Sequence, residues 1–150
     1  MKILIRLTLL SILTLTFAGM ALADKPGHHP HYLHALSDLR HARALLDKLA
    51  MNEHRDLWEE KAIDKIDAAI RTIKGAAIDD GKDLNDHPPI DAHLKRGERY
   101  RKALELLDAA HHDVTMEEDT AQSQGLQGRV IADVDEAHRI VEKLQARYNK

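Results

Sequence analysis

Three stretches of the chain carry apolar residues spaced alternately three and four positions apart. This spacing places the apolar residues on one face of an α-helix and is typical of antiparallel bundles. The stretches contain Ile63, Ile66, Ile70, Ile73 and Ala77; Tyr100, Ala103, Leu107, Ala110 and Val114; and Val130, Val134, Ala137, Val141, Leu144 and Tyr148. A looser stripe over residues 32–50 contains Leu36, Leu39, Ala42, Leu46 and Leu49. Because no stretch of useful length alternates between apolar and polar residues, we expect four helices and no strand.

Local signals mark where these helices begin and end. Pro30 suits the first turn of the first helix, where its missing N–H would have no partner anyway. Asp56, followed three residues later by Glu59, predicts a capping box at the start of the second helix. Gly81 can end the second helix, and Pro88 and Pro89 prevent its continuation. Asp91 can then cap the third helix. Connections of about 6 to 12 residues then favour an all-α, up-down-up-down four-helix bundle.

The first 23 residues have the pattern of a secretory signal peptide. Lys2 and Arg6 precede an apolar stretch over residues 7–18, and Ala21 and Ala23 provide small residues at positions −3 and −1 of a cleavage site. We therefore expect a cleaved leader, residues 1–23, and a single helical domain, residues 24–150. The expected location is the periplasm or the exterior of the cell, with no stable membrane insertion after cleavage.

Composition excludes several classes of protein. The chain of 150 residues has the length of one domain, and it contains no cysteine, which excludes disulfide frameworks, thiolate metal sites and thiol catalysis. With five aromatic residues and a formal charge of −3, it does not resemble a nucleic-acid binder. Neither a glycine-rich phosphate loop nor a nucleophile with its base and orienting residue is recognisable, so we expect no enzyme.

Histidine is unusually frequent, with 11 residues in the chain. All of them follow the leader, and removal of residues 1–23 leaves 20 basic and 25 acidic residues, a charge of −5 with neutral histidine. An unperturbed imidazole titrates near pH 6.5, so full protonation would change the charge from −5 to +6. The net charge of the mature chain is therefore expected to respond strongly to mild acid.

If the helices alternate in direction, six histidines gather at one end of the bundle, and four of these form the strongest candidate metal site. The candidate ligands are His31, His34, His87 and His93, with Asp38 or Asp86 as an oxygen ligand. Neutral imidazoles and carboxylates suit zinc, nickel or copper in an oxidising compartment. The alternatives are weak, opportunistic metal binding and solvent-exposed histidines without a metal role.

Three segments contain aspartate and histidine three residues apart, which invites comparison with the Glu-x-x-His pairs of di-iron bundles. These segments are Asp38 to His41, Asp108 to His111 and Asp135 to His138. On the alternating arrangement, however, Asp108 and Asp135 point outward, and His111 lies roughly 16 Å along the axis from His138. We therefore expect no di-iron centre.

Two segments, residues 29–40 (HPHYLHALSDLR) and residues 79–89 (DDGKDLNDHPP), resemble a group of small secreted bacterial helical proteins without an assigned function. The resemblance covers most of the mature chain. It implies a helical fold and export, and it implies no site or activity.

Two functions remain open for an exported, non-catalytic bundle. The first is binding of a divalent transition metal at the histidine-rich end. The second is a protein-interaction or stress-response role, in which histidine protonation changes the surface charge and a protein is the partner.

Overall fold

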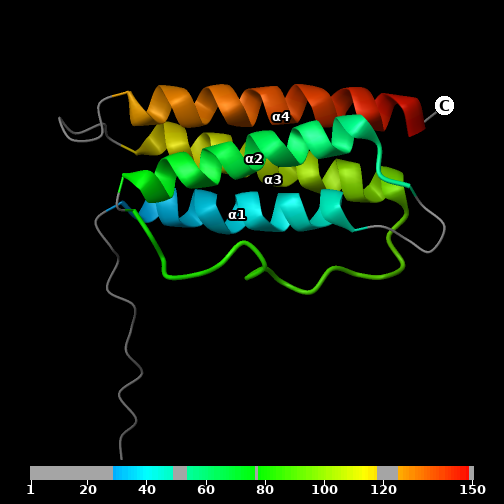
Figure 1. The fold of residues 1–150 in the computed structure, drawn as a ribbon, viewed down its shortest axis with the longest axis horizontal. Coiled ribbons are helices and arrows are strands. Elements are labelled where there is room, and N and C mark those ends of the chain that lie inside the picture. Colours follow the sequence, from blue (N-terminus) through cyan, green and yellow to red (C-terminus); the bar gives the residue numbers. More distant parts are fainter. Residues whose placement is uncertain (1–28, 49–53, 77, 118–124, 149–150) are drawn as a thin grey trace, which may run out of the picture.

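The computed structural model describes residues 29–48, 54–76, 78–117 and 125–148 and forms a bundle of four helices (Figure 1). The helices are α1 (Pro30–Asp47), α2 (Leu57–Gly75), α3 (Arg96–Met116) and α4 (Leu126–Tyr148). The prediction of an all-α four-helix bundle is confirmed. The predicted leader, residues 1–23, lies outside the described residues. None of the described helices combines the length and apolar character needed to span a bilayer.

The predicted apolar stripes form the core between the four helices. All of the predicted positions in the described residues are buried except Tyr148, whose ring is about half exposed at the end of α4. Leu49 and Ala77 lie outside the described residues. The looser stripe of α1 is buried as completely as the others. Helix α1 also buries Tyr32, Ala35 and Leu45.

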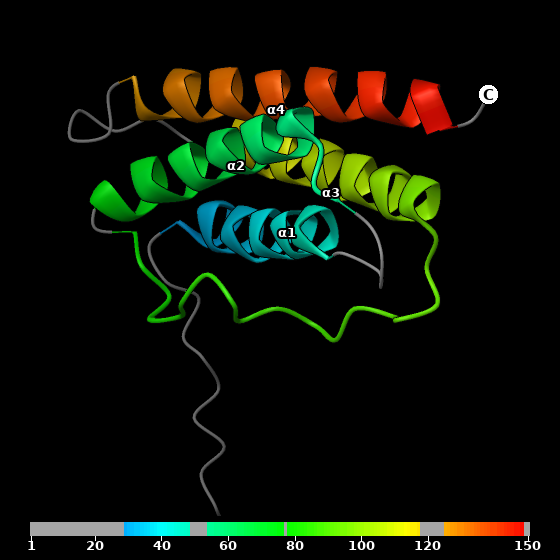
Figure 2. The ribbon, with the colours of Figure 1, turned by 45° about the vertical axis from the view of Figure 1, so that its right-hand side comes forward.

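The directions of the helices differ from the alternating order that we expected. Each helix packs against two neighbours: α1 against α2 and α3, and α4 against the same two. The start of α1 meets the end of α3, where His29 Nδ1 lies 2.9 Å from Glu117 Oε1. The starts of α2 and α3 meet each other, because Arg96 Nη2 donates to Glu59 Oε2 at 2.6 Å. The order is therefore up-down-down-up, and α2 and α3 run in the same direction (Figures 1 and 2).

The long connection between α2 and α3 makes this order possible. Helix α2 ends at Gly75, earlier than Gly81 suggested, and α3 begins only at Arg96. The chain between them runs back along α1 to the end where α2 began (Figures 1 and 2). An 18-residue helix such as α1 is about 27 Å long, which an extended chain covers easily. We call residues 78–95 the strap.

A buried ion pair holds the strap against α1. Arg40 is fully buried, and its two terminal nitrogens donate to the two carboxylate oxygens of Asp80 at 2.7 and 2.6 Å. Burial alone would raise the pKa of Asp80, but the hydrogen bonds from Arg40 hold it below its usual value. Ile78, two residues before Asp80, is buried in the core, and Ile90 and Leu94 pack against the core further along the strap.

Helix α1 receives its N-terminal cap from α3. Its own N-cap residue, His29, has a left-handed backbone (φ 107°) and provides no side-chain cap. Instead, Glu117 Oε2 accepts hydrogen bonds from the backbone N–H groups of His31 (3.1 Å) and Tyr32 (3.4 Å). A carboxylate is favourable at this position because the exposed N–H groups give a helix N-terminus a partial positive charge.

The opposite end of the bundle is organised around a buried carboxylate. The predicted capping box of α2 is confirmed: Asp56 accepts from the Trp58 N–H, and Glu59 accepts from the Asp56 N–H, both at 2.8 Å. The fully buried Glu59 also accepts from Arg96 and from the Tyr100 hydroxyl, the latter at 2.6 Å. Burial would raise the pKa of Glu59, but these hydrogen bonds keep it low.

Replacement of Asp80 by Asn tests the buried ion pair. Loss of the carboxylate charge leaves the buried Arg40 guanidinium uncompensated, so we expect the free energy of unfolding to fall by about 3 kcal/mol in urea denaturation. The matched control is Asp79→Asn, next in the chain, whose carboxylate pairs with the partly exposed Lys74. Equal effects of the two substitutions would contradict the assigned role of Asp80.

Replacement of Glu117 by Ala tests the cap that α3 provides to α1. Removal of an N-cap acceptor costs about 1 to 2 kcal/mol, and we expect a loss of this size in urea denaturation. Hydrogen exchange of the first amides of α1 should accelerate in parallel. The exposed Glu142 on α4 provides the control substitution, Glu142→Ala, which should change neither quantity.

Candidate functional site

The predicted metal ligands do not form a common site in this fold. His31, His34 and Asp38 lie on the first half of α1, at the end of the bundle where α3 finishes. His87 lies beside the second half of α1, where it lines a cavity of about 310 Å³ with Arg43, and Asp86 precedes it on the strap.

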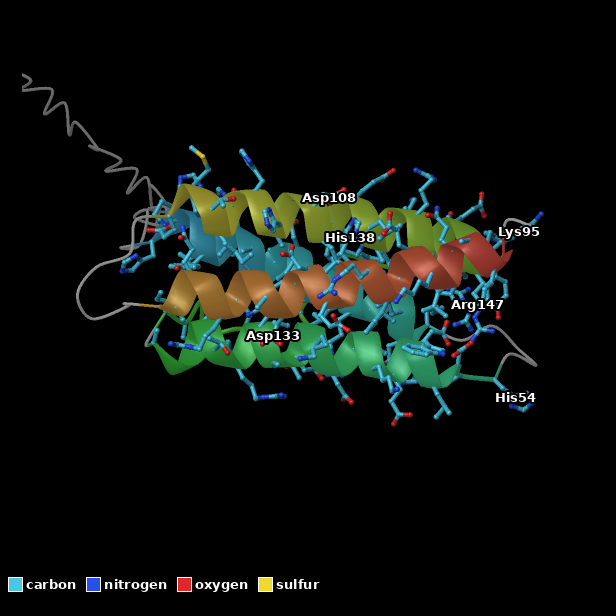
Figure 3. All side chains as sticks on the ribbon, turned by 90° about the horizontal axis from the view of Figure 1, so that it is seen from above. His54, Lys95, Asp108, Asp133, His138 and Arg147 are labelled. Carbon is cyan, nitrogen blue, oxygen red and sulfur yellow. The ribbon has the colours of Figure 1, made fainter. Side chains whose placement is uncertain are left out.

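His93 lies near the far end of the bundle, just before α3, where its backbone N–H donates to Asp91. Figure 3 places Lys95, two residues later, at the same end as His54 and Arg147. The expected alternating order would bring these residues together, because α3 would then begin next to the start of α1. Since α3 runs in the opposite direction, His93 is separated from His31 by most of the length of the bundle.

Part of the predicted set does come together, with one residue that the sequence analysis did not select. His31 Nδ1 lies 3.4 Å from Asp113 Oδ1 on α3. Burial raises the pKa of Asp38, and the negative charge of Asp113 raises it further, while His34 opposes the increase. We call His31, His34, Asp38 and Asp113 the α1–α3 cluster. Asp113 was missed because only the direction of α3 brings it to α1.

A second group lies on the other flank of α3 and consists of two of the Asp-x-x-His segments, in which we expected no di-iron centre. His138 Nε2 lies 3.1 Å from Asp108 Oδ1, and His111 Nε2 lies 3.5 Å from Asp135 Oδ1. The Asp-x-x-His motifs of α3 and α4 therefore face each other, and the expected 16 Å between the levels of His111 and His138 is wrong. We call these four residues the α3–α4 quartet. A usable signal was present in the sequence, because two successive helices contain the same Asp-x-x-His spacing.

All of these histidine–carboxylate contacts involve α3. The contacts of His29 and His31 join it to α1, and those of His111 and His138 join it to α4. In their present conformations, the side chains of the described residues form no group of three or more histidines, aspartates and glutamates that could hold a metal ion. Metal binding at either group would therefore require side chains to turn toward a common point.

The contact between α1 and the strap contains a third pair of histidines. Burial lowers the pKa of His41, and the nearby His87 of the strap and Lys102 of α3 lower it further. These three groups are all cationic when protonated, so they repel one another in acid. This arrangement opposes protonation of His41. It differs from the contacts on α3, in which each histidine faces a carboxylate.

Comparison with protein-family models, curated proteins and solved structures gives no match for the chain. The resemblance to small secreted helical proteins therefore stays a prediction.

The lowered pKa of His41 predicts how acid affects stability. Because the unfolded chain binds a proton at this position near pH 6.5 and the folded chain binds it only at lower pH, the contribution of His41 is present above pH 6.5 and is lost below it. We expect His41→Gln to reduce the loss of unfolding free energy between pH 7.5 and 5.5. The exposed His93, replaced in the same way, should leave that loss unchanged. The same pH dependence in the wild-type and His41→Gln proteins would argue against this role.

Proposed function

We propose that the protein is an exported, non-catalytic helical bundle that binds a divalent transition metal ion at the α1–α3 cluster. The observation that supports this proposal is the position of Asp113, which contacts His31 and lies close enough to Asp38 to raise its pKa. With His34, these residues offer two imidazoles and two carboxylates. This set of donors suits zinc, nickel or copper, and no thiolate is available in the chain to compete with it.

Electrostatics favours a cation at this position. Asp38 and Asp113 repel each other across the contact between α1 and α3, and half-buried Asp38 is also poorly solvated. Opposite charge near a carboxylate favours its ionised form, so a divalent ion would relieve both penalties. The imidazoles can provide the remaining ligands in their neutral form, and binding would release any protons that they or Asp38 carry.

The movements that binding requires are confined to partly exposed side chains. The His31 side chain is 39% exposed and that of Asp113 is 20% exposed, while His34 is exposed on the next turn of α1. Rotamers of such side chains interconvert rapidly, so the donors can turn without unfolding either helix. We therefore expect an exchangeable surface site, in which the ion links α1 to α3.

A second candidate function, a pH-responsive protein-interaction or stress-response bundle, needs no metal. It is supported by the four histidine–carboxylate contacts that join α3 to its neighbours. Protonation of these histidines would convert each contact into an ion pair while the surface as a whole loses negative charge. The same residues would then control association with a protein partner.

Thermal melting of the purified protein with chelator, and then with one equivalent of zinc, nickel or copper, tests the first function. A ligand at a hundredfold excess over its dissociation constant stabilises the folded state by about 2.7 kcal/mol, so we expect an increase of several degrees with one of these metals. His31→Ala combined with His34→Ala should reduce this increase, and so should Asp113→Asn.

The matched control replaces His87 and His93 by Ala, which removes two predicted ligands that lie away from the α1–α3 cluster. This variant should keep the full increase in melting temperature. No increase with any metal, or equal losses in both double variants, would rule out the α1–α3 cluster. Self-association that appears near pH 6 in the presence of chelator would then favour the second function.

A further inference from the structure

The α3–α4 quartet has an internal symmetry that the α1–α3 cluster lacks. On each helix the aspartate and the histidine are three residues apart, which places them on one face and separates them by about 4.5 Å along the axis. Because α3 and α4 are antiparallel, the aspartate of each helix lies opposite the histidine of the other. Figure 3 shows His138 of α4 next to Asp108 of α3. The four side chains therefore occupy about one helical turn of the surface.

The quartet surrounds a hollow between the two helices. The cavity measures about 270 Å³ and is lined by the four polar side chains together with Leu107 and Val134. Leu107 and Val134 belong to the core and are almost completely buried, whereas the side chains of His138 and Asp108 are 28% and 72% exposed. The hollow thus has an apolar base that excludes water from below and a polar rim that is open to solvent.

We propose that this hollow is a second site for a divalent transition metal, with His111 and His138 as nitrogen ligands and Asp108 and Asp135 as oxygen ligands. In a tetrahedral zinc site the metal–ligand bonds are about 2.0 to 2.2 Å long, so neighbouring ligand atoms lie about 3.4 Å apart. The two imidazole–carboxylate pairs already have separations of 3.1 and 3.5 Å. Each pair therefore stands at the distance that two ligands of one ion require.

The two imidazole–carboxylate pairs lie at different levels along the helix axes. Formation of the site requires their side chains to turn toward each other. The aspartates are on the rim of the hollow, and both histidines reach across the helix contact with Nε2, the atom that would bind the ion. A bound ion would compensate the charges of Asp108 and Asp135 and would link α3 to α4. This site is independent of the α1–α3 cluster, because it lies on the opposite flank of α3 and shares no residue with it.

Isothermal titration of the purified protein with zinc chloride at pH 7.5 tests this proposal. We expect the α3–α4 quartet to contribute one equivalent of zinc, which His111→Ala combined with His138→Ala removes. The carboxylate variant, Asp108→Asn with Asp135→Asn, should weaken the same equivalent at least tenfold while it preserves side-chain size. Circular dichroism without metal provides a check that each variant retains its helices.

The control variant replaces two exposed histidines that lie outside both groups, His54 and His93, by Ala. It should bind zinc as the wild type does. An unchanged stoichiometry and affinity in both quartet variants would overturn the proposal, and so would an equal loss in the control, which would indicate unspecific binding by surface histidines. Asp113→Asn separates the two sites: it should remove the equivalent of the α1–α3 cluster and leave that of the α3–α4 quartet.

Discussion

The ion pair between Arg40 and Asp80 is the interaction on which the arrangement of the bundle depends. A fully buried guanidinium is tolerated only when a carboxylate compensates it, and the residue that does so belongs to the strap. The pair fixes the beginning of the strap against α1 and leads the chain back along the length of the bundle. Helix α3 must then start beside α2 and finish beside the start of α1.

The direction of α3 determines the contacts at the start of α1. It brings Glu117 to the uncapped start of α1, and it brings Asp113 to the histidines and the carboxylate of the same helix. On its other flank, the short connection to α4 places two Asp-x-x-His motifs opposite each other. Helix α3 therefore carries acidic groups toward both neighbours, and histidines of all three helices take part in the contacts.

The sequence predicted the helices and the core well, because burial on one face of a helix leaves a period that local spacing reveals. The capping box at Asp56 and Glu59 was equally readable, since both partners lie within one turn. The direction of each helix could not be predicted, because an apolar stripe is the same for a helix that runs up or down. In addition, residues 76–95 contain an apparent helix end at Gly81, which α2 does not reach. The wrong direction of α3 also misled the prediction of the metal site. It grouped the ligands on α1 with His87 and His93, and not with Asp113.

The up-down-down-up order also separates the two ends of the described fold. Helix α1 starts at one end of the bundle and α4 finishes at the other, whereas an alternating bundle would bring both to the same end (Figure 1). A force applied between residues 29 and 148 would therefore act parallel to the helix axes. It would have to slide the packed helices past one another against the whole core at once, while the same force on an alternating bundle would peel its helices away in turn. The order of the helices thus makes sliding, and not peeling, the response of this fold to a pull on its two ends.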